Sequence, residues 1–585
     1  MNVPEASGDS ESTKSSSRIS RRKLLAGAGV SLGTAVAGGV FAANPGLAQE
    51  QTKAGPATSN VFSGTAVPLE ITQSAGDWLV ANGNFAATRS AVNSPINASN
   101  LDRLSIAWTV PITVSGSMCD RSGMSANAVI IEQSIYYQDL LSNIFALDRV
   151  TGKELWRRNY NASNGGPNGV AVANGIVYAA TGDTGVVVAL DARTGEVKWE
   201  RDVSDPGFAR IEMAPLVYAN IVYVSSRPNN VRNGMSQRGP QGILYALNAE
   251  TGTTLWTFDT SIDNPWGSPR ISSGPGLWYP PSVDDMGNLY FGTGNAVSFP
   301  DNGEYVNGSS GPGSNDRPAS MVSIDTATGG VRWAVDAQPQ GCCDRDVQQT
   351  PVLVTVTLNE TPTLVSVSAG KSGTVIATLA GSGALLWKTK VGMHEDDECL
   401  VAHCHDTGKL YPGGKGILGR FESPIAFAEK LIFVPYVDFQ MSLTPNTAAS
   451  TAGGDVSQPT GGLAAIDAVT GDLVWDVKLN AMPVAGATVV NDVVLSGSRD
   501  GFLRAYELKT GKEVWKFYTS AGLNAPLAIA GDMIVFSAGA PIAPTRDVSN
   551  EATPGGPTGV LPVMSVSQEP NLTFQILALN LGLGS

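Results

Sequence analysis

Short runs in which apolar and polar residues alternate recur along the chain, and the runs come in pairs joined by a turn. Each pair ends on a tryptophan four residues after a glycine; clear copies are Ala146–Trp156, Ala189–Trp199, Ala246–Trp256 and Ala465–Trp475, and looser copies are Ser323–Trp333, Thr378–Trp387 and Ala505–Trp515. Alternation with a period of two is typical of a β-strand with one buried face. An Asp or Asn before Thr-Gly favours a tight turn, because its side chain bonds nearby backbone groups and glycine takes positive φ. The pattern therefore predicts β-hairpins.

These hairpins predict an all-β ring. A tryptophan offers a large flat surface that one hairpin cannot bury alone, so the units must stack on one another. Repeats of this kind indicate a solenoid or a propeller, and all-β units of unequal length favour a β-propeller. An eighth closing strand lacks its turn but ends on Trp108. We therefore expect an eight-bladed β-propeller with tryptophan-docking repeats, whose blades close on Trp108, Trp156, Trp199, Trp256, Trp333, Trp387, Trp475 and Trp515.

Composition and charge narrow the class of protein. The chain has 585 residues, of which 42% are hydrophobic and only 15% are charged, and it contains 66 glycines. This balance suits a turn-rich β protein that is exported. The formal net charge of −14 argues against nucleic acid or an anionic membrane surface as a partner.

The N-terminus has the pattern of a targeting segment. Ser20–Leu25 reads SRRKLL, a twin-arginine motif, and a weakly apolar run follows it up to a small-residue cleavage site at Ala48. An uncleaved membrane anchor is the alternative, which the weak hydrophobicity disfavours, and no second span is visible. Twin-arginine export carries folded proteins, so the expected location is periplasmic or extracellular. We expect a signal peptide over 1–48, a flexible leader over 49–75 and the propeller over 76–585.

Long polar insertions lie in the central repeats. Rich in Gly, Asn, Ser and Pro, they span Ser225–Gly242, Asn264–Pro281, Ser298–Ser320, Val391–Phe421 and Thr444–Gly462. Binding and catalytic residues are commonly found on loops that a rigid scaffold positions. We expect these loops to cover one face of the ring, over its axial channel.

Three stretches resemble the pyrroloquinoline quinone (PQQ)-dependent alcohol dehydrogenases, or quinoproteins. They are the opening segment Asp77–Trp108, the LYFGTGN sequence of Leu289–Asn295 and the AGKSGTVIATLAGSGALLW sequence of Ala369–Trp387. The stretch from Lys390 to Pro435 looks closer to a branch similar to polyvinyl-alcohol dehydrogenases. The resemblance implies a dehydrogenase that oxidises a small or polymeric alcohol with PQQ and calcium, and that passes electrons to a separate acceptor.

The same resemblance implies roles for four residues. Asn295 would be a calcium ligand, because hard cations take oxygen ligands, and Asp316 would be the carboxylate that removes the hydroxyl proton. Lys371 would contact the quinone and stabilise the charge of its reduced form, and Trp278 would lie flat under its ring. The ordinary structural alternatives are a turn cap, a surface aspartate, a solvated lysine and a core tryptophan. Convergence of the four at one end of the channel would favour the enzyme.

Departures from the family favour a second interpretation, a non-catalytic propeller that serves as a binding or assembly scaffold. The early segment holds the single Cys119 where the family has an adjacent cysteine pair, and the pair Cys342-Cys343 comes later in the chain. Asn168 stands where an arginine usually precedes the Gly-Val-Ala strand. Glu212 precedes the Ala-Pro-Leu strand, whereas the family's metal-binding glutamate follows it.

All three histidines fall in one short stretch with two cysteines, in the order His394, Cys399, His403, Cys404 and His405. Four residues separate the cysteines, which is more than a haem attachment motif has. Alternatively, the Cys and His side chains could be ligands of a zinc or copper ion. In an exported protein, a Cys399–Cys404 disulfide that pins a polar loop is favoured over a metal site.

Overall fold

The computed structural model describes residues 76–91, 93–112, 125, 127–203, 210–226, 242–260, 276–294, 319–337, 346–394, 423–438, 460–540 and 575–582. They form thirty-four strands and one short 3-10 helix, η1 (Leu101–Arg103). The expected signal peptide and leader lie outside these residues. Within them, no helix is both long enough and apolar enough to cross a membrane.

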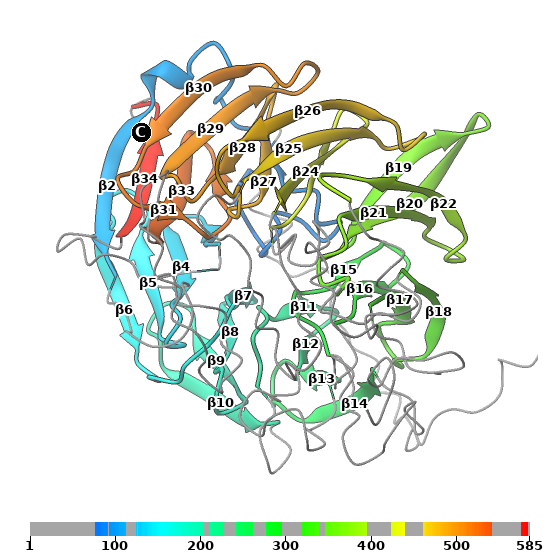
Figure 1. Ribbon diagram of the computed structural model, residues 1–585. Coiled ribbons are helices and arrows are strands. Elements are labelled where there is room, and N and C mark those ends of the chain that lie inside the picture. Colours follow the sequence, from blue (N-terminus) through cyan, green and yellow to red (C-terminus); the bar gives the residue numbers. More distant parts are fainter. Residues whose placement is uncertain are drawn as a thin grey trace, which may run out of the picture. The chain divides into compact units, whose positions relative to one another are not determined.

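The strands form eight sheets that follow one another around a ring, which confirms the predicted eight-bladed propeller (Figure 1). Their pairs are antiparallel, except for the one that β1 makes. The first three blades along the chain are β3 (Val129–Ile131), β4 (Ser134–Gln138), β5 (Ile144–Asp148) and β6 (Glu154–Arg158); β7 (Val170–Ala173), β8 (Ile176–Ala180), β9 (Val186–Asp191) and β10 (Val197–Asp202); and β11 (Leu216–Tyr218), β12 (Ile221–Ser225), β13 (Ile243–Asn248) and β14 (Thr254–Asp259).

The next four blades repeat this order of strands from the ring centre outwards. They are β15 (Ser282–Val283), β16 (Asn288–Gly292), β17 (Ser320–Asp325) and β18 (Val331–Asp336); β19 (Val352–Leu358), β20 (Thr361–Ala369), β21 (Thr374–Leu379) and β22 (Leu385–Lys390); β23 (Ala426–Ala428), β24 (Leu431–Asp438), β25 (Thr460–Asp467) and β26 (Leu473–Leu479); and β27 (Ala487–Val490), β28 (Val493–Gly497), β29 (Phe502–Glu507) and β30 (Glu513–Tyr518).

The eighth blade combines strands from both ends of the described chain. Its strands are β31 (Gly522–Leu523), β32 (Ala528–Ala530), β33 (Met533–Ala540), β34 (Gln575–Asn580) and β2 (Ser105–Pro111). Trp108 on β2 lies opposite Ala578 on β34. The eighth repeat lacks its turn because its outer strand comes from the start of the chain and its neighbouring strand comes from the end.

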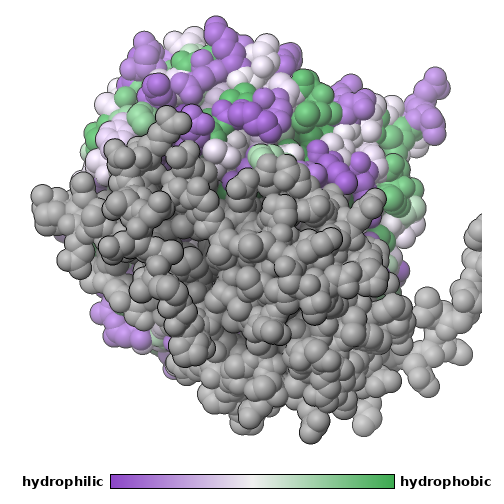
Figure 2. Space-filling view, viewed as in Figure 1, coloured by the Kyte–Doolittle hydropathy of each residue, from purple (hydrophilic) through white to green (hydrophobic). Residues whose placement is uncertain are grey.

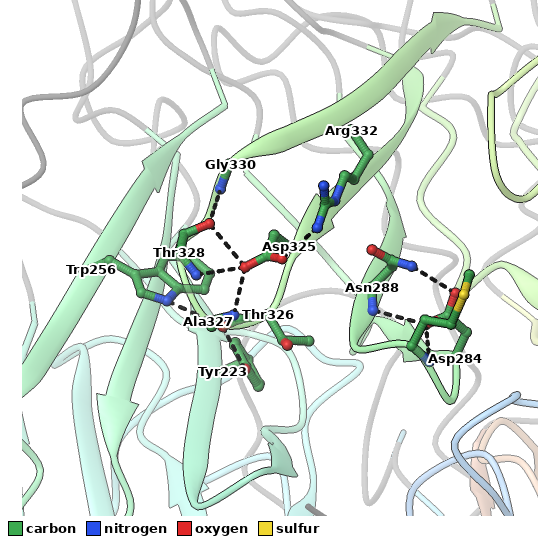
Figure 3. Close-up of polar contacts among 11 residues, drawn as sticks. Tyr223, Trp256, Asp284, Asn288, Asp325, Thr326, Ala327, Thr328, Gly330 and Arg332 are labelled. Carbon is green, nitrogen blue, oxygen red and sulfur yellow. Dashed lines mark hydrogen bonds and ion pairs between the residues drawn. The ribbon is translucent and has the colours of Figure 1, made fainter. Parts of the chain in front are cut away.

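The repeated tryptophans lie at interfaces between blades, and Figure 3 shows one of these contacts. Trp256 Nε1 donates a hydrogen bond to Thr326 O at 3.2 Å, and the Asp325 carboxylate accepts two backbone N–H groups of the turn. Gly329 has a φ of +71°, and a Cβ atom there would lie 2.8 Å from the Trp256 ring. Glycine is therefore needed both for the turn and for the close approach. The same contact recurs on Gly152, Gly195, Gly252, Gly383, Gly471 and Gly511.

Trp515 of the seventh blade is packed differently. Within the described part of the chain, no glycine makes the close contact with its ring that the other repeats show. The ring lies nearly parallel to that of Phe517, with the two centroids 6.1 Å apart. Its neighbour, the eighth blade, has no continuous turn between β34 and β2. A single hydrophobic cluster joins the first, seventh and eighth blades at this point and closes the ring.

The opening segment 76–91 crosses the inner strands of the ring. Its backbone bonds the innermost strands of five blades, at Ile130, Val283, Leu353, Phe427 and Val489. Its last residues form β1 (Ser90–Ala91), which pairs in parallel with β27. The segment therefore ties the first blade to the fourth, fifth, sixth and seventh.

Arg89 is the central side chain of this segment, and it is fully buried. Its guanidinium donates to Ala487 O, Thr488 Oγ1 and Leu527 O at 2.9, 2.8 and 2.8 Å, and to Asn82 Oδ1 at 3.2 Å. Since these acceptors are uncharged, burial lowers the pKa of Arg89 to about 9. The guanidinium is still protonated at neutral pH.

The two ends of the ring differ. Because the strands are antiparallel, the innermost strand of each blade begins, and the second strand ends, at the same end of the ring, which we call the loop face. The described residues that flank the predicted insertions lie at this face, for example 226 and 242, or 294 and 319. The insertions themselves, and so their predicted cover over the channel, lie mostly outside the described residues.

The outer strands face solvent on the ring's periphery. Leu155, Val197 and Leu255 are examples of apolar side chains that these strands leave exposed. Figure 2 shows apolar and polar residues interspersed over the described part of the surface in this view. The buried core lies between the blades, in clusters that each join neighbouring sheets.

Candidate functional site

Four short segments meet at the loop face of the fourth and fifth blades. The segment before β15 contains Trp278, and the segment after β16 contains the Gly-Thr-Gly sequence. The segment before β19 contains Asp346, and the segment after β20 contains Lys371. Backbone hydrogen bonds link each segment to the next: Gly294 N to Gly276 O (3.0 Å), Val347 N to Thr293 O (3.2 Å) and Lys371 N to Asp346 O (2.9 Å). Residues nearly a hundred positions apart in the sequence are thereby held side by side.

Lys371 lies in a tight turn between β20 and β21, in which Gly373 N bonds Gly370 O at 2.9 Å. Its Nζ atom lies 3.2 Å from Asp346 Oδ2 and 5.8 Å from the centroid of the Trp278 ring. The two charged side chains are 6% and 2% exposed. Because both are desolvated, the pair depends on close geometry, and the solvated-lysine alternative is wrong.

Trp278 is half-buried, while its neighbours Leu277 and Tyr279 are buried. Leu277 N bonds Ser225 Oγ at 3.1 Å, which fixes this segment against the third blade. Trp278 is less buried than a core tryptophan, and the ammonium group of Lys371 lies over its indole ring.

The glycines of the two signature sequences have a steric reason at this site. A Cβ atom on Gly292 would collide with the Val347 carbonyl oxygen, and one on Gly370 would lie 2.5 Å from the Asp346 carbonyl oxygen. Only glycine lets these backbones approach so closely. The Gly-Thr-Gly and Ala-Gly-Lys sequences therefore place the segment of Asp346 between them.

The other two predicted site residues, Asn295 and Asp316, lie outside the described residues. Gly294, directly before Asn295, is described, and its carbonyl accepts Ala319 N at 2.8 Å. The Gly-Thr-Gly-Asn sequence thus starts at the site, beside the segments of Trp278 and Asp346. The roles of Asn295 and Asp316 remain predictions.

Asp346 is the site residue that sequence reasoning missed. It belongs to the CCDRDV sequence, in which the cysteines are the residues that suggest chemistry. The available signal was topological: an acidic residue shortly before an innermost strand shares the loop face with a lysine directly after the second strand of that blade. This signal becomes visible only once β19 and β20 are known to be the innermost and second strands of the same blade.

A buried polar link connects this site to the opening segment. Asn82 Nδ2 donates to Thr350 Oγ1 at 3.0 Å, and Thr350 Oγ1 donates to Pro280 O at 2.7 Å. Thr350 follows Asp346 and Pro280 follows Trp278 along the chain. Arg89 in turn donates to Asn82, so this hydrogen-bond network reaches the backbone segments that carry Trp278 and Asp346.

The two departures from the family that fall on described residues are accommodated elsewhere on the loop face. Asn168 is buried and donates to Asp139 O at 2.7 Å, within the first and second blades. The buried Glu212 carboxylate accepts Gly165 N at 3.2 Å, and Arg210, which is paired with Asp183, lies 3.8 Å away. Both side chains therefore have local structural roles between the first and third blades.

The metal predictions rest on few described donors. Within the described residues, there is no group of three or more His, Cys, Asp or Glu side chains that could hold a metal ion. At the candidate site, Asp346 offers carboxylate oxygen. All five cysteines, with His403 and His405, fall outside the described residues, so the choice between disulfide and metal in that stretch remains a prediction.

Two family patterns match parts of the chain. Residues 78–171 match the family described as "Glucose/ethanol/alcohol dehydrogenase, beta-propeller domain". Residues 142–270 and 459–546 match the family described as "Outer membrane protein assembly factor BamB". Neither match covers half of the chain.

Curated relatives align over most of the chain at low identity. The putative dehydrogenase XoxF of Paracoccus denitrificans is 27% identical over 79% of this chain and 87% of its own length. Quinohemoprotein alcohol dehydrogenase ADH IIB of Pseudomonas putida is 26% identical over 77% and 71%. The lanthanide-dependent methanol dehydrogenase of Methylacidiphilum fumariolicum is 24% identical over 78% and 82%.

Solved structures share the fold. The quinohemoprotein alcohol dehydrogenase of Comamonas testosteroni superposes with a TM-score of 0.69 and 20% identity, over 87% of this chain and 81% of the other. A europium-containing methanol dehydrogenase superposes with a TM-score of 0.69 and 21% identity, over 87% and 99%. At these identities the likeness shows the propeller alone.

Proposed function

We propose, on the premise that this chain is a distant homologue of the PQQ-dependent alcohol and methanol dehydrogenases, that it is an exported quinoprotein dehydrogenase. It oxidises the hydroxyl group of an alcohol or polyol and passes the electrons to a separate acceptor. The resemblance of Lys390–Pro435 to polyvinyl-alcohol dehydrogenases extends the substrate class to polymeric alcohols. Export rests on the twin-arginine pattern of Ser20–Leu25.

The observation that carries the proposal is the position of Lys371 between Asp346 and the Trp278 ring. A planar quinone needs a flat apolar surface to stack on and a cation beside its oxygens. Trp278 and Lys371 offer these two features at one place on the loop face. A pure scaffold has no evident need for a buried lysine there, because burying a charged pair costs free energy.

Oxidation of an alcohol removes a proton from the hydroxyl group and a hydride from the carbon that bears it. Bound PQQ would supply the acceptor for the hydride and its electron pair. Lys371 would stabilise negative charge on the quinone oxygens, and Trp278 would orient the ring. A carboxylate takes the hydroxyl proton; Asp346 is the described candidate, and Asp316, predicted from the sequence, is the other.

A hard cation beside the quinone fits the donor chemistry of this site. Asp346 supplies carboxylate oxygen, and Asn295 would add amide oxygen, the ligand types that calcium prefers. Calcium is the metal that the resemblance implies, while one relative is described as lanthanide-dependent. We propose that Asp346 and Asn295 would hold a metal of one of these two kinds, which would supply Lewis-acid chemistry to the quinone.

The test is a titration of the purified full chain with PQQ, followed through the absorbance of the cofactor, with calcium or with lanthanum. We expect micromolar or tighter binding that depends on one of the metals. Lys371→Ala should weaken it by about tenfold to a hundredfold, because hydrogen bonds to a charged group contribute about 1.5–3 kcal/mol. The matched control is Lys388→Ala, an exposed lysine on β22 of the same blade, which should bind as the wild type does.

The second candidate function is the non-catalytic scaffold, which the local structural roles of Asn168 and Glu212 favour. Absence of binding at micromolar PQQ with either metal would support the scaffold and remove the quinoprotein proposal. Binding followed by metal-dependent reduction of an artificial acceptor with an alcohol would establish the enzyme. If Asp316 takes the hydroxyl proton, Asp316→Asn should then abolish turnover without loss of PQQ binding. Asp346→Asn, which also removes the partner of Lys371 and a proposed metal ligand, should lower both.

A further inference from the structure

His394 lies at the loop face, in the first residues of the insertion that follows β22. These residues are fixed to two blades: Val391 N bonds Gly373 O at 2.8 Å in the fifth blade, and Met393 N bonds Asp438 Oδ1 at 2.8 Å in the sixth. The histidine therefore follows a well-anchored backbone. It packs directly against the turn that carries Lys371.

The imidazole Nε2 atom of His394 lies 3.2 Å from Gly373 O and 3.1 Å from Val391 O. Carbonyl oxygens only accept hydrogen bonds, so Nε2 must carry a proton and donate. The contact is close, because a Cβ atom on Gly373 would lie 2.8 Å from Nε2. Gly373 also has a φ of +71°, which fixes this end of the turn.

We propose that His394 is a positioning residue for Lys371. The turn is held on one side by the hydrogen bond from Lys371 N to Asp346 O, at 2.9 Å. On the other side, the Nε2–H group of His394 holds the carbonyl of Gly373. Together these contacts keep the Lys371 ammonium beside Asp346 and over Trp278. The inference rests on the proposed quinone site, because it concerns how the cation of that site is aimed.

The first test compares two substitutions of His394 in the PQQ titration. His394→Gln keeps an N–H donor near the Nε2 position, whereas His394→Asn places its amide too far back to reach Gly373 O. We expect His394→Asn to weaken binding by about tenfold and His394→Gln to stay within about threefold of the wild type. In the Lys371→Ala background, His394→Asn should add no further loss, because it acts through Lys371.

The second test needs no quinone. In the quinone-free full chain, the acetylation rate of Lys371 is measured by mass spectrometry, with the exposed Lys388 as internal standard. The rate should be low in the wild type, where the Lys371 side chain is 6% exposed, low in His394→Gln and several-fold higher in His394→Asn. Equal rates in all three proteins would overturn the inference. If the wild type fails to bind PQQ, the proposed function is wrong, while the acetylation rates still decide the role of His394.

Discussion

At the scale of single residues, the site depends on places where two backbones touch. Gly292 ends β16 against the carbonyl oxygen of Val347, the residue after Asp346. This contact holds the Gly-Thr-Gly sequence and the Asp346 segment together. A side chain as small as a methyl group would separate them, and the position of the Asp346 carboxylate relative to Lys371 would change.

We predict that Gly292→Ala destabilises the protein by about 1–3 kcal/mol, the usual cost of overpacking, and weakens PQQ binding at temperatures where the fold persists. Chemical denaturation and the PQQ titration measure the two effects. Gly381→Ala is the matched control, because a Cβ atom there meets nothing within 4 Å. Equal stability and affinity of both variants would contradict the packing argument.

Local sequence predicted part of this site. Lys371 was predicted from a stretch that resembles a family signature, and Trp278 from its place upstream of the Gly-Thr-Gly-Asn sequence. The structure brings the two side chains together, while their roles stay predictions. Asp346 was missed because its significance comes from its pairing with Lys371, twenty-five positions away, and from the order of β19 and β20 in their blade. Contacts of this kind depend on topology and leave no local pattern in the sequence.

At the scale of elements, the repeat is the unit that sequence predicts well, because its Asp, Gly and Trp all lie within about a dozen residues. Each tryptophan but Trp515 then docks on the turn of the next blade, as Trp256 does on Gly329. The interface between the seventh and eighth blades is packed differently. Trp515 completes the repeat in sequence, yet the turn it would dock on is replaced by the junction of β2 and β34. Chain closure, which is a property of the ring, decides this packing.

Trp256 and Trp515 form a matched pair for a test, since both are half-buried and both end the same repeat. Trp256→Phe removes the N–H group that bonds Thr326 O and should cost about 1 kcal/mol of unfolding free energy. Trp515→Phe should cost clearly less, because no hydrogen bond of its indole is present among the described residues. The two free energies come from denaturant unfolding followed by far-UV circular dichroism. A larger loss for Trp515→Phe would mean that its interface is also held by the indole nitrogen.

At the scale of the whole molecule, the opening segment has a role that its sequence did not reveal. Its residues lack the repeat pattern, so the sequence predicts only that they begin the ring. In the structure they bond the inner strands of five blades and carry Arg89, whose acceptors lie in the seventh and eighth blades and in the segment itself. The ring is therefore closed twice, by β2 and β34 at its edge and by Arg89 at its centre.

We predict that Arg89→Met destabilises the protein by about 3 kcal/mol or more, because several buried acceptors, among them Ala487 O and Leu527 O, lose their donor together. Arg103→Ala, which removes an exposed arginine from η1, should change stability by less than about 0.5 kcal/mol. Denaturant unfolding followed by tryptophan fluorescence measures both. Since Arg89 also donates to Asn82, which bonds Thr350 beside the site, PQQ affinity should fall in Arg89→Met even where the protein is folded. Unchanged affinity in the folded variant would show that the ring centre and the site are energetically independent.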